Sequence, residues 1–320
     1  MSERAPRVSV IVCTRDRAAL LRRCLRSLLE DTSTSQREVI VVDNGSRDGT
    51  REVVGAASAG TSESVRYLVE PRAGKSHALN TAVAAAAGEF LLFTDDDVEV
   101  EPGWTDAMMT ALAAPGVVAA GGRTVPDWEV APPAWVDATL ERDLGVRDLG
   151  LERRALEPDD VIGANLGMRA GAIKANPAPF DSRLGPRGRL KVDYEEFDLL
   201  RRLARSGTIA YAPDAVVRHH VPATRATWRW MRRTYFQRGF GKARLERGDG
   251  AASPSWIRRL RLCRHNYFVA RRLRRRNIDE PPTPATAAAE FHAYLDLGHD
   301  IDMLLARLPR VATWTAGLPL

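Results

Sequence analysis

The sequence predicts an α/β fold in which a sheet of mainly parallel strands is flanked by helices. Two observations carry this prediction. Up to about residue 125, apolar runs alternate with segments of helical spacing, and the apolar runs are continuous rather than alternating with polar residues. Continuous runs are typical of strands that are covered on both faces, as in parallel sheets with helical crossovers.

The elements follow in order along the chain. Strands are predicted at residues 8–13, 38–42, 65–69, 90–93 and 117–120, and helices at 18–30, 75–87 and 104–113. Residues 126–160 contain the stretch APPAWVDATLERDLG and are interpreted as an insertion. A helix at 192–205, short strands at 208–211 and 215–217, further helices after residue 223 and a last helix at 287–308 complete the prediction.

Composition excludes several classes of protein. The 320 residues are 44% hydrophobic and 28% charged, which is typical of a globular enzyme and unlike a fibrous or disordered chain. Cys13, Cys24 and Cys263 show no disulfide or metal-type spacing. No apolar run approaches the roughly 18 to 20 residues of a membrane-spanning helix. We therefore expect a cytoplasmic location.

Charge is unevenly distributed along the chain. The net charge is +6, but residues 201–276 contain 21 Lys and Arg against 3 Asp and Glu, whereas the remainder contains 26 and 38. A basic segment at residues 201–276 thus lies within a chain that is otherwise acidic. This segment is either a binding surface for a polyanion or an electrostatic counterpart to an acidic site.

Polar clusters follow three of the predicted strands. They are Thr14-Arg15-Asp16, Asp43-Asn44-Gly45-Ser46 and Asp95-Asp96-Asp97. Ligands bind beyond the carboxyl ends of the strands in open α/β sheets, although turns and helix caps also explain the second cluster.

Adjacent carboxylates such as Asp95, Asp96 and Asp97 repel one another, which favours a bound Mg²⁺ or Mn²⁺. Strand alternation places Asp95 and Asp97 on one side and Asp96 on the other. A solvated acidic loop is the alternative.

These segments resemble a known family. VSVIVCTRDR, EVIVVDNGSRDGT and GEFLLFTDDD are similar to the nucleotide-sugar-binding half of the family 2 glycosyltransferases, which have the GT-A fold, and EEFDLLRRL and AVVRHHVP extend the likeness over roughly residues 8–244. The resemblance implies a GT-A domain at 1–222, with a donor half at about 8–125 and an acceptor half at about 160–222. A basic helical region at 223–320 follows. The Ala- and Arg-rich composition hints at a bacterial source.

The resemblance also implies roles for individual residues. Asp43 would accept a hydrogen bond from the donor's base, and Asp97 would be the principal carboxylate on the metal of the DXD motif. The implied donor-binding residues are Thr14, Arg15, Asp43, Asn44, Arg72, Lys75, Asp95 and Asp96. The implied metal ligands are Asp97, Asp95 and His219, with His220 as a weaker candidate.

The catalytic base is expected in DYEEFDLLRRL. The family has Glu-Asp before this helix, and this chain has Glu195-Glu196. By resemblance Glu196 would be the base and Glu195 an acceptor contact, with Asp193 as the fallback. The alternative is that these acids only stabilise a helix N-terminus.

The implied function is the metal-dependent, inverting transfer of one sugar from a UDP-, GDP- or dTDP-sugar to a small-molecule, lipid-linked or glycan acceptor. Processive relatives carry a Gln-x-x-Arg-Trp signature, which residues 237–240 do not match. The last stretch of about 75 residues lies outside the resemblance.

The alternative function is a non-catalytic protein that binds nucleic acid or an anionic membrane through the basic segment. Two apolar helical faces lie there: Trp228, Met231 and Tyr235, and Trp256, Leu260, Cys263, Tyr267 and Ala270. Such stripes either pack on the sheet, which we expect, or lie on a membrane surface, which would make the protein peripheral.

Overall fold

The computed structural model describes residues 6–33, 35–186, 192–249, 256–279 and 282–306. The chain divides into two compact units. The sheet unit comprises Met1–Asp127, Gly145–Ser182 and Glu196–His220, and the helical unit comprises Trp128–Leu144, Arg183–Glu195 and Val221–Leu320. Each unit is formed by segments that are distant in sequence.

An eight-stranded sheet organises the first unit, with the order β3-β2-β1-β4-β7-β6-β8-β5. Its strands are β1 (Val8–Thr14), β2 (Arg37–Asp43), β3 (Ser64–Val69), β4 (Phe90–Asp95), β5 (Val98–Val100), β6 (Val117–Trp128), β7 (Asn165–Arg169) and β8 (Thr208–Val221). β1, β2, β3 and β4 are parallel, whereas β7 pairs antiparallel with β4 and β6, and β5 pairs antiparallel with β8.

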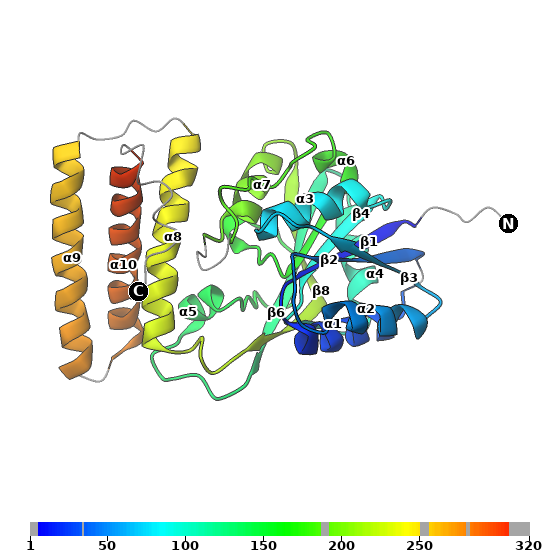
Figure 1. Ribbon diagram of the computed structural model, residues 1–320, viewed down its shortest axis with the longest axis horizontal. Helices are drawn as coiled ribbons and strands as arrows, with labels where there is room; N and C mark the ends of the chain where they lie inside the picture. Colours follow the sequence, from blue (N-terminus) through cyan, green and yellow to red (C-terminus); the bar gives the residue numbers. More distant parts are fainter. Residues whose placement is uncertain (1–5, 34, 187–191, 250–255, 280–281, 307–320) are drawn as a thin grey trace. The chain divides into compact units, whose positions relative to one another are not determined.

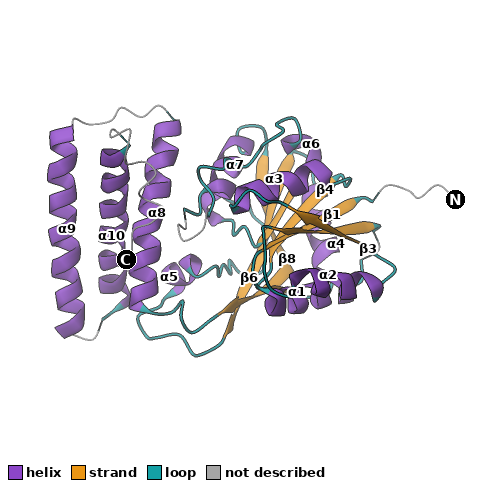
Figure 2. Ribbon diagram, in the orientation of Figure 1, coloured by secondary structure: helices purple, strands orange, loops and turns teal. Residues whose placement is uncertain are grey.

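Helices cover both faces of this sheet (Figure 2). α1 (Ala18–Glu30), α2 (Thr50–Ala59) and α4 (Trp104–Ala113) pack on one face. α3 (Lys75–Ala85), α6 (Ala170–Ile173) and α7 (Glu195–Leu203) lie on the other (Figure 1). The short 3₁₀ helix η1 is Pro158–Asp160. Because β1, β2 and β4 are buried along nearly their whole length, both faces contribute to the core, which explains the continuous apolar runs in the sequence.

The predicted α/β class is confirmed, and several elements differ from the sequence prediction. β8 is one strand where two short ones were predicted on either side of Pro213. β5 pairs only with residues 217–219, so the missing N–H of Pro213 costs no hydrogen bond to β5. α2, β5 and β7 were not predicted; β5 has three residues and β7 contains Gly167, so neither gives a periodic signal.

The helical unit contains α5 (Ala138–Asp143), α8 (Trp228–Gly248), α9 (Trp256–Asp279) and α10 (Pro284–Leu305). α10 packs against both α8 and α9. Its Phe291 is fully buried and makes ring contacts with Trp135, Trp228 and Tyr235. No described helix is both long enough and apolar enough to cross a bilayer.

Candidate functional site

Three parallel strands of the sheet unit end side by side. In the register of the sheet, Thr14 at the end of β1 lies opposite Asp43 at the end of β2, and Cys13 lies opposite Asp95 at the end of β4. The three polar clusters of the sequence therefore meet at one edge, as expected from parallel pairing.

The acidic cluster divides into two groups, because β4 ends at Asp95. Asp96 and Asp97 share one guanidinium: Arg17 Nη1 lies 2.9 Å from Asp96 Oδ1 and 3.1 Å from Asp97 Oδ2. The expectation that Asp95 and Asp97 share a side was wrong, since the strict alternation of a strand stops at Asp95 and the next two residues form a turn.

Arg17 was not predicted as a site residue, although it belongs to the same TRDR segment as Arg15. Burial raises the pKa of Asp96 to about 6; the charge of Arg17 and the hydrogen bond from Thr14 Oγ1 (2.8 Å) oppose this effect, and the charge of Asp97 adds to it. The chain thus supplies one cation to its own carboxylates. Arg15, in contrast, is exposed and lies near Asp16.

Asp97 also lies beside His219 of β8. His219 Nε2 is 3.5 Å from Asp97 Oδ1, and both residues are about 95% buried, with 4% and 5% exposure. Their strands fix this pair: Val98 of β5 lies opposite His219, and the backbone N–H of His220 donates to the Asp97 carbonyl (2.9 Å).

Gly145 packs against the ring of His219 and was missed by sequence reasoning. Its φ is +83°, and a Cβ at this position would lie 2.5 Å from His219 Cε1. The absence of a side chain here therefore leaves the space that the imidazole fills. His220 points elsewhere, with Nδ1 3.4 Å from an Asp127 carboxylate oxygen.

This donor set fits a hard divalent cation in part. Carboxylate oxygen and neutral imidazole nitrogen both bind Mn²⁺, and Mg²⁺ and Mn²⁺ commonly complete their coordination with water and substrate phosphates. In the described part of the chain, no group of three or more His, Cys, Asp or Glu could hold a metal by itself. Asp97 and His219 would therefore share the ion with the substrate.

At the end of β2, Asp43 is already hydrogen-bonded on both oxygens. Oδ1 accepts from the Ser46 N–H (2.7 Å), and Oδ2 accepts from the Tyr67 hydroxyl (2.6 Å). Burial, reinforced by this hydrogen bond to Asp43, raises the pKa of Tyr67 to about 12, so Tyr67 remains a donor at neutral pH. Tyr67 lies within the predicted third strand and was not predicted as a site residue.

Asn44 holds the loop before α3. Its Nδ2 donates to the carbonyls of Glu70 (2.9 Å) and Arg72 (2.8 Å), and its Oδ1 accepts from the Gly74 N–H (2.8 Å). Arg72 itself pairs with Glu70 at 2.7 Å and is exposed. Asn44 thus has a structural role, because these hydrogen bonds position the first turn of α3.

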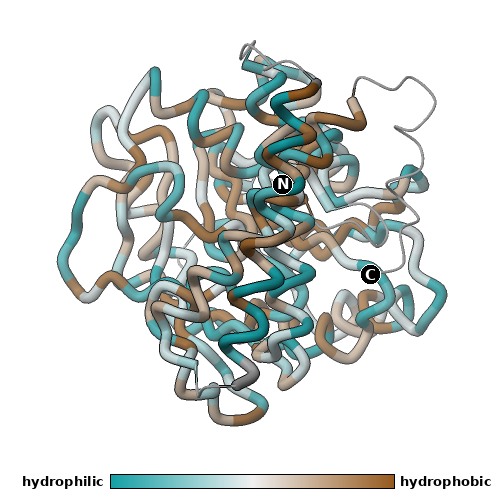
Figure 3. Tube along the Cα trace, turned by 90° about the vertical axis from the view of Figure 1, so that its left-hand side faces the viewer, coloured by the Kyte–Doolittle hydropathy of each residue, from teal (hydrophilic) through white to brown (hydrophobic). Residues whose placement is uncertain are grey.

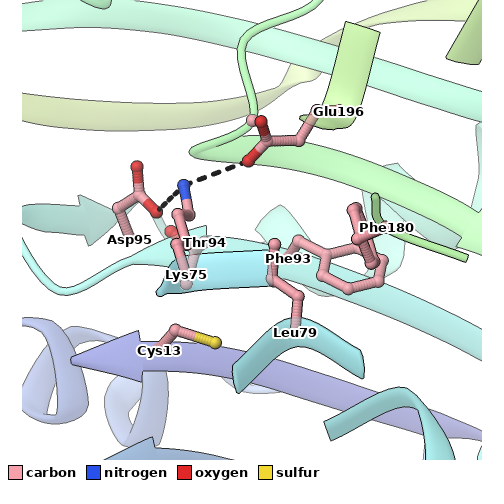
Figure 4. A pocket seen from close by; sticks show the side chains of 9 residues that line it. Cys13, Lys75, Leu79, Phe93, Thr94, Asp95, Phe180 and Glu196 are labelled. Carbon is pink, nitrogen blue, oxygen red and sulfur yellow. Dashed lines mark ion pairs between the residues drawn. The ribbon is translucent and has the colours of Figure 1, made fainter. Parts of the chain in front are cut away.

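Lys75, the first residue of α3, connects the strand edge to α7. Its Nζ lies 2.9 Å from Asp95 Oδ1 and 3.0 Å from Glu196 Oε1, as Figure 4 shows. A Cβ on Gly163 would lie 2.7 Å from Glu196 Oε1, so this glycine allows the carboxylate its close approach. The small pocket around these groups is lined by Cys13, Lys75, Leu79, Phe93, Thr94, Asp95, Gly163, Phe180 and Glu196.

The other two candidate acids have different surroundings. Glu195 is 1% exposed, whereas the Glu196 side chain is 17% exposed. Asp193 has a positive φ of 51° and lies 3.9 Å from Arg238 Nε, within the helical unit. Glu196 contacts Lys75 of the strand edge.

Residues 9–175, just over half of the chain, match the family described as "Glycosyl transferase family 2". The "Succinoglycan biosynthesis protein ExoM" of Rhizobium meliloti is 26% identical over 241 residues, which cover 74% of each chain. The "Glycosyltransferase AglE" of Haloferax volcanii is 31% identical over 123 residues, which cover 38% of this chain and 40% of that protein. The chain spans less than half the length of two of its curated relatives.

A solved structure has a similar fold. The mannosyltransferase PcManGT from Pyrobaculum calidifontis, in complex with GDP-Man and Mn²⁺, superposes with a TM-score of 0.57 at 20% identity. The match covers 99% of this chain and 77% of that one.

Proposed function

Because the chain belongs to glycosyl transferase family 2, we propose that it transfers a single sugar from a nucleoside-diphosphate sugar to an acceptor hydroxyl, with inversion and with a divalent metal bound. The donor lies in the half formed by residues 8–125 and the acceptor in the half formed by residues 160–222.

One observation carries this proposal. Lys75 Nζ lies about equally close to Asp95 at the strand edge and to Glu196 on α7, 2.9 and 3.0 Å away. A carboxylate on the donor side, Asp95, and a second carboxylate on α7, Glu196, therefore both face the Lys75 ammonium group. A displacement needs this arrangement, with a leaving group on one side and a proton acceptor on the other.

The donor's base is assigned to Asp43. Uracil, thymine and guanine each carry a ring N–H, and a carboxylate oxygen has two lone pairs, so Asp43 can accept this bond while keeping those from Ser46 and Tyr67. Thr14, Arg15, Asp95 and Asp96 line the same edge. The bound Mn²⁺ or Mg²⁺ would supply charge stabilisation for the departing diphosphate, with Asp97 and His219 as its protein ligands and Asp95 as a further candidate.

Glu196 is assigned as the base. Lys75 holds Oε1 and so orients the carboxylate, which leaves Oε2 to accept the acceptor proton. As the proton moves to Glu196, the acceptor oxygen forms a bond to the anomeric carbon and the bond from that carbon to the diphosphate oxygen breaks. Lys75 or Arg72 would meet the charge of the diphosphate; in this structure Lys75 pairs with Asp95 and Arg72 pairs with Glu70.

The Glu196→Gln variant tests the base. We expect kcat to fall by about 10²- to 10⁴-fold with donor affinity retained. The uncharged amide cannot accept the proton of the acceptor hydroxyl, and it interacts more weakly with Lys75 than the carboxylate does. The matched control is Glu89→Gln, an exposed carboxylate of the same unit. A fully active Glu196→Gln enzyme contradicts the assignment.

A thermal-shift panel of UDP-, GDP- and dTDP-sugars identifies the donor. GDP-mannose belongs in the panel because it is the ligand of the PcManGT structure. At about 100 times its Kd, one donor should stabilise the protein by about 2.7 kcal/mol in the presence of Mn²⁺. Asp97→Asn should remove the Mn²⁺-dependent part of that shift.

The alternative is a binding protein without transfer activity. It predicts the reverse result: no donor shifts the unfolding temperature, and tight oligonucleotide binding survives Asp97→Ala. These results together, with no sugar transfer by the wild type, would remove the enzymatic proposal.

A further inference from the structure

α9 of the helical unit has two different faces. Toward α10 it presents Arg259 and Ala270, which are buried, and half-buried residues such as Cys263 and Asn266. On the other side, four large apolar side chains are 48–52% exposed: Ile257, Leu260, Tyr267 and Phe268. We call these four residues, with Arg261, Arg264 and Arg271 among them, the outer face of α9. The prediction that the apolar stripes pack on the sheet is therefore wrong for Leu260 and Tyr267, which are exposed. Met231 and Tyr235 of α8 are buried, and Tyr235 contacts Phe291 of α10.

Polar contacts fix which side of α9 faces inward. Arg259 Nη1 lies 2.7 Å from Asp300 Oδ1 of α10, and both residues are buried. Asn266 donates to the other oxygen of Asp300 (2.9 Å), and Asn277 donates to Glu290 (2.8 Å). Rotating α9 to bury its aromatic side chains would leave Asp300 and Glu290 buried without these partners, which is costly. The exposure of the outer face is thus a stable property of this packing.

The charge on α9 specifies the kind of partner. The helix contains nine arginines and one aspartate, and eight of the arginines are exposed. A second copy of the same face would bring like charges together, which disfavours self-association through it. A surface that complements α9 therefore offers apolar groups to its exposed apolar side chains and negative charges to its arginines.

The apolar residues distinguish a membrane from a nucleic acid. Ile257 and Leu260 are aliphatic and offer no ring on which a base can stack. Tyr267 and Phe268 pack edge to face, with ring centroids 5.6 Å apart, and Arg264 lies over the Phe268 ring at 5.9 Å. Figure 3 turns α9 toward the viewer and shows apolar and polar residues interleaved along it. Interleaved apolar and Arg side chains are typical of helices that lie in a bilayer interface, where long Arg side chains extend to the lipid phosphates.

We propose that the outer face of α9 docks the protein on the surface of an anionic lipid bilayer, with Ile257, Leu260, Tyr267 and Phe268 among the acyl chains and the flanking arginines on the phosphates. Binding is interfacial, in agreement with the finding that no described helix can span a bilayer. The proposal does not depend on the proposed sugar transfer.

Co-sedimentation of the full chain with lipid vesicles tests the proposal. Vesicles of phosphatidylcholine and phosphatidylglycerol in equal parts should bind the protein, whereas phosphatidylcholine alone should bind it far less. Binding should fall steeply at about 1 M salt, where the screening length is near 3 Å. The double variant Arg261→Gln/Arg264→Gln should weaken binding by about 30-fold, and Phe268→Ser by about tenfold.

Matched controls use exposed residues elsewhere. Leu151→Ser removes an apolar side chain that is 74% exposed in the sheet unit, and Arg229→Gln/Arg233→Gln removes two exposed charges from α8. Both should bind vesicles like the wild type, and a thermal melt checks that each variant folds.

Three results would overturn the proposal. They are equal binding to neutral and anionic vesicles, an equal loss of binding in the α8 control, or vesicle binding that survives Phe268→Ser in a folded protein. Tight oligonucleotide binding that needs Arg261 and Arg264, without vesicle binding, would assign the face to nucleic acid instead.

Discussion

Arg17 offsets the negative charge of two buried carboxylates in the sheet unit. Its single Nη1 contacts both Asp96 and Asp97, so the pair is tolerable before any metal binds. A metal that shares Asp97 with a diphosphate would compete with this guanidinium for the same oxygens. In the proposed reaction, a bound metal would therefore take over part of the charge balance that Arg17 provides to Asp97 in this structure.

Gly145 offers a sharp test of the His219 position. Gly145→Ala places a Cβ 2.5 Å from the imidazole, at a φ of +83°. We expect a loss of stability of about 1–2 kcal/mol from the backbone alone, and in addition a higher Mn²⁺ requirement for donor binding, because the ring must move. Thermal melts and Mn²⁺ titrations with donor measure the two effects.

Gly150→Ala is the control for that experiment. Gly150 has the same φ of +83°, and a Cβ there meets nothing within 4 Å. It should show the backbone effect only. If both variants require the same Mn²⁺ concentration, the location of the His219 ring does not matter for the metal.

At the scale of elements, ion pairs connect the helices of the helical unit. Arg232 of α8 lies 2.6 Å from the fully buried Glu290 of α10, and His299 of α10 lies 2.8 Å from Glu246 of α8. Such contacts orient α8 and α10 about a small apolar core formed by Phe236, Phe240 and Leu297. The orientation of α9, and hence of its outer face, follows from its own contacts with Asp300 and Glu290 of α10.

His299 makes the packing of α10 depend on pH. Burial lowers the pKa of His299, but hydrogen bonds with Asp300 and Glu246 outweigh it and raise the pKa above the usual 6.5. A raised histidine pKa gives stability that is fully present below about pH 6.5 and is lost as the pH rises through the folded-state value. We expect α10 amides to lose about 0.2–1 kcal/mol of protection against hydrogen exchange over that range.

The matched control for this effect is His292→Gln, an exposed histidine on the same helix. His299→Gln should flatten the pH dependence, and His292→Gln should leave it unchanged. An unaltered profile in His299→Gln would show that the Glu246 contact does not stabilise α10.

At the scale of the whole molecule, the chain combines a GT-A sheet unit with a basic helical unit. The family expected from the sequence is confirmed by the match over residues 9–175. The charge asymmetry now has two locations: the carboxylates at the strand edge, and the exposed arginines of α9.

Hydrogen exchange of the full chain with donor and Mn²⁺ locates donor binding. New protection should concentrate at residues 14–17, 43–49 and 94–97 of the sheet unit, because these loops end β1, β2 and β4. Asp97→Asn should abolish the Mn²⁺-dependent part. Protection that appears only in α8–α10 would contradict the donor site.

The sequence by itself determined the α/β class and the edge at which the polar clusters meet. Continuous apolar runs require strands covered on both faces, and parallel strands bring their carboxyl ends to one edge, so Thr14, Asp43 and Asp95 could be grouped from local patterns alone.

Only the tertiary structure decided which side chains become partners. Asp97 with His219, Lys75 with Glu196, and Gly145 with His219 are pairs of residues far apart in the chain, and no spacing rule encodes such contacts. The inward face of α9 was likewise decided by Asp300 and Glu290 on another helix. Periodicity identifies a helical stripe, but the free energy of pairing buried charges determined which stripe of α9 turned inward.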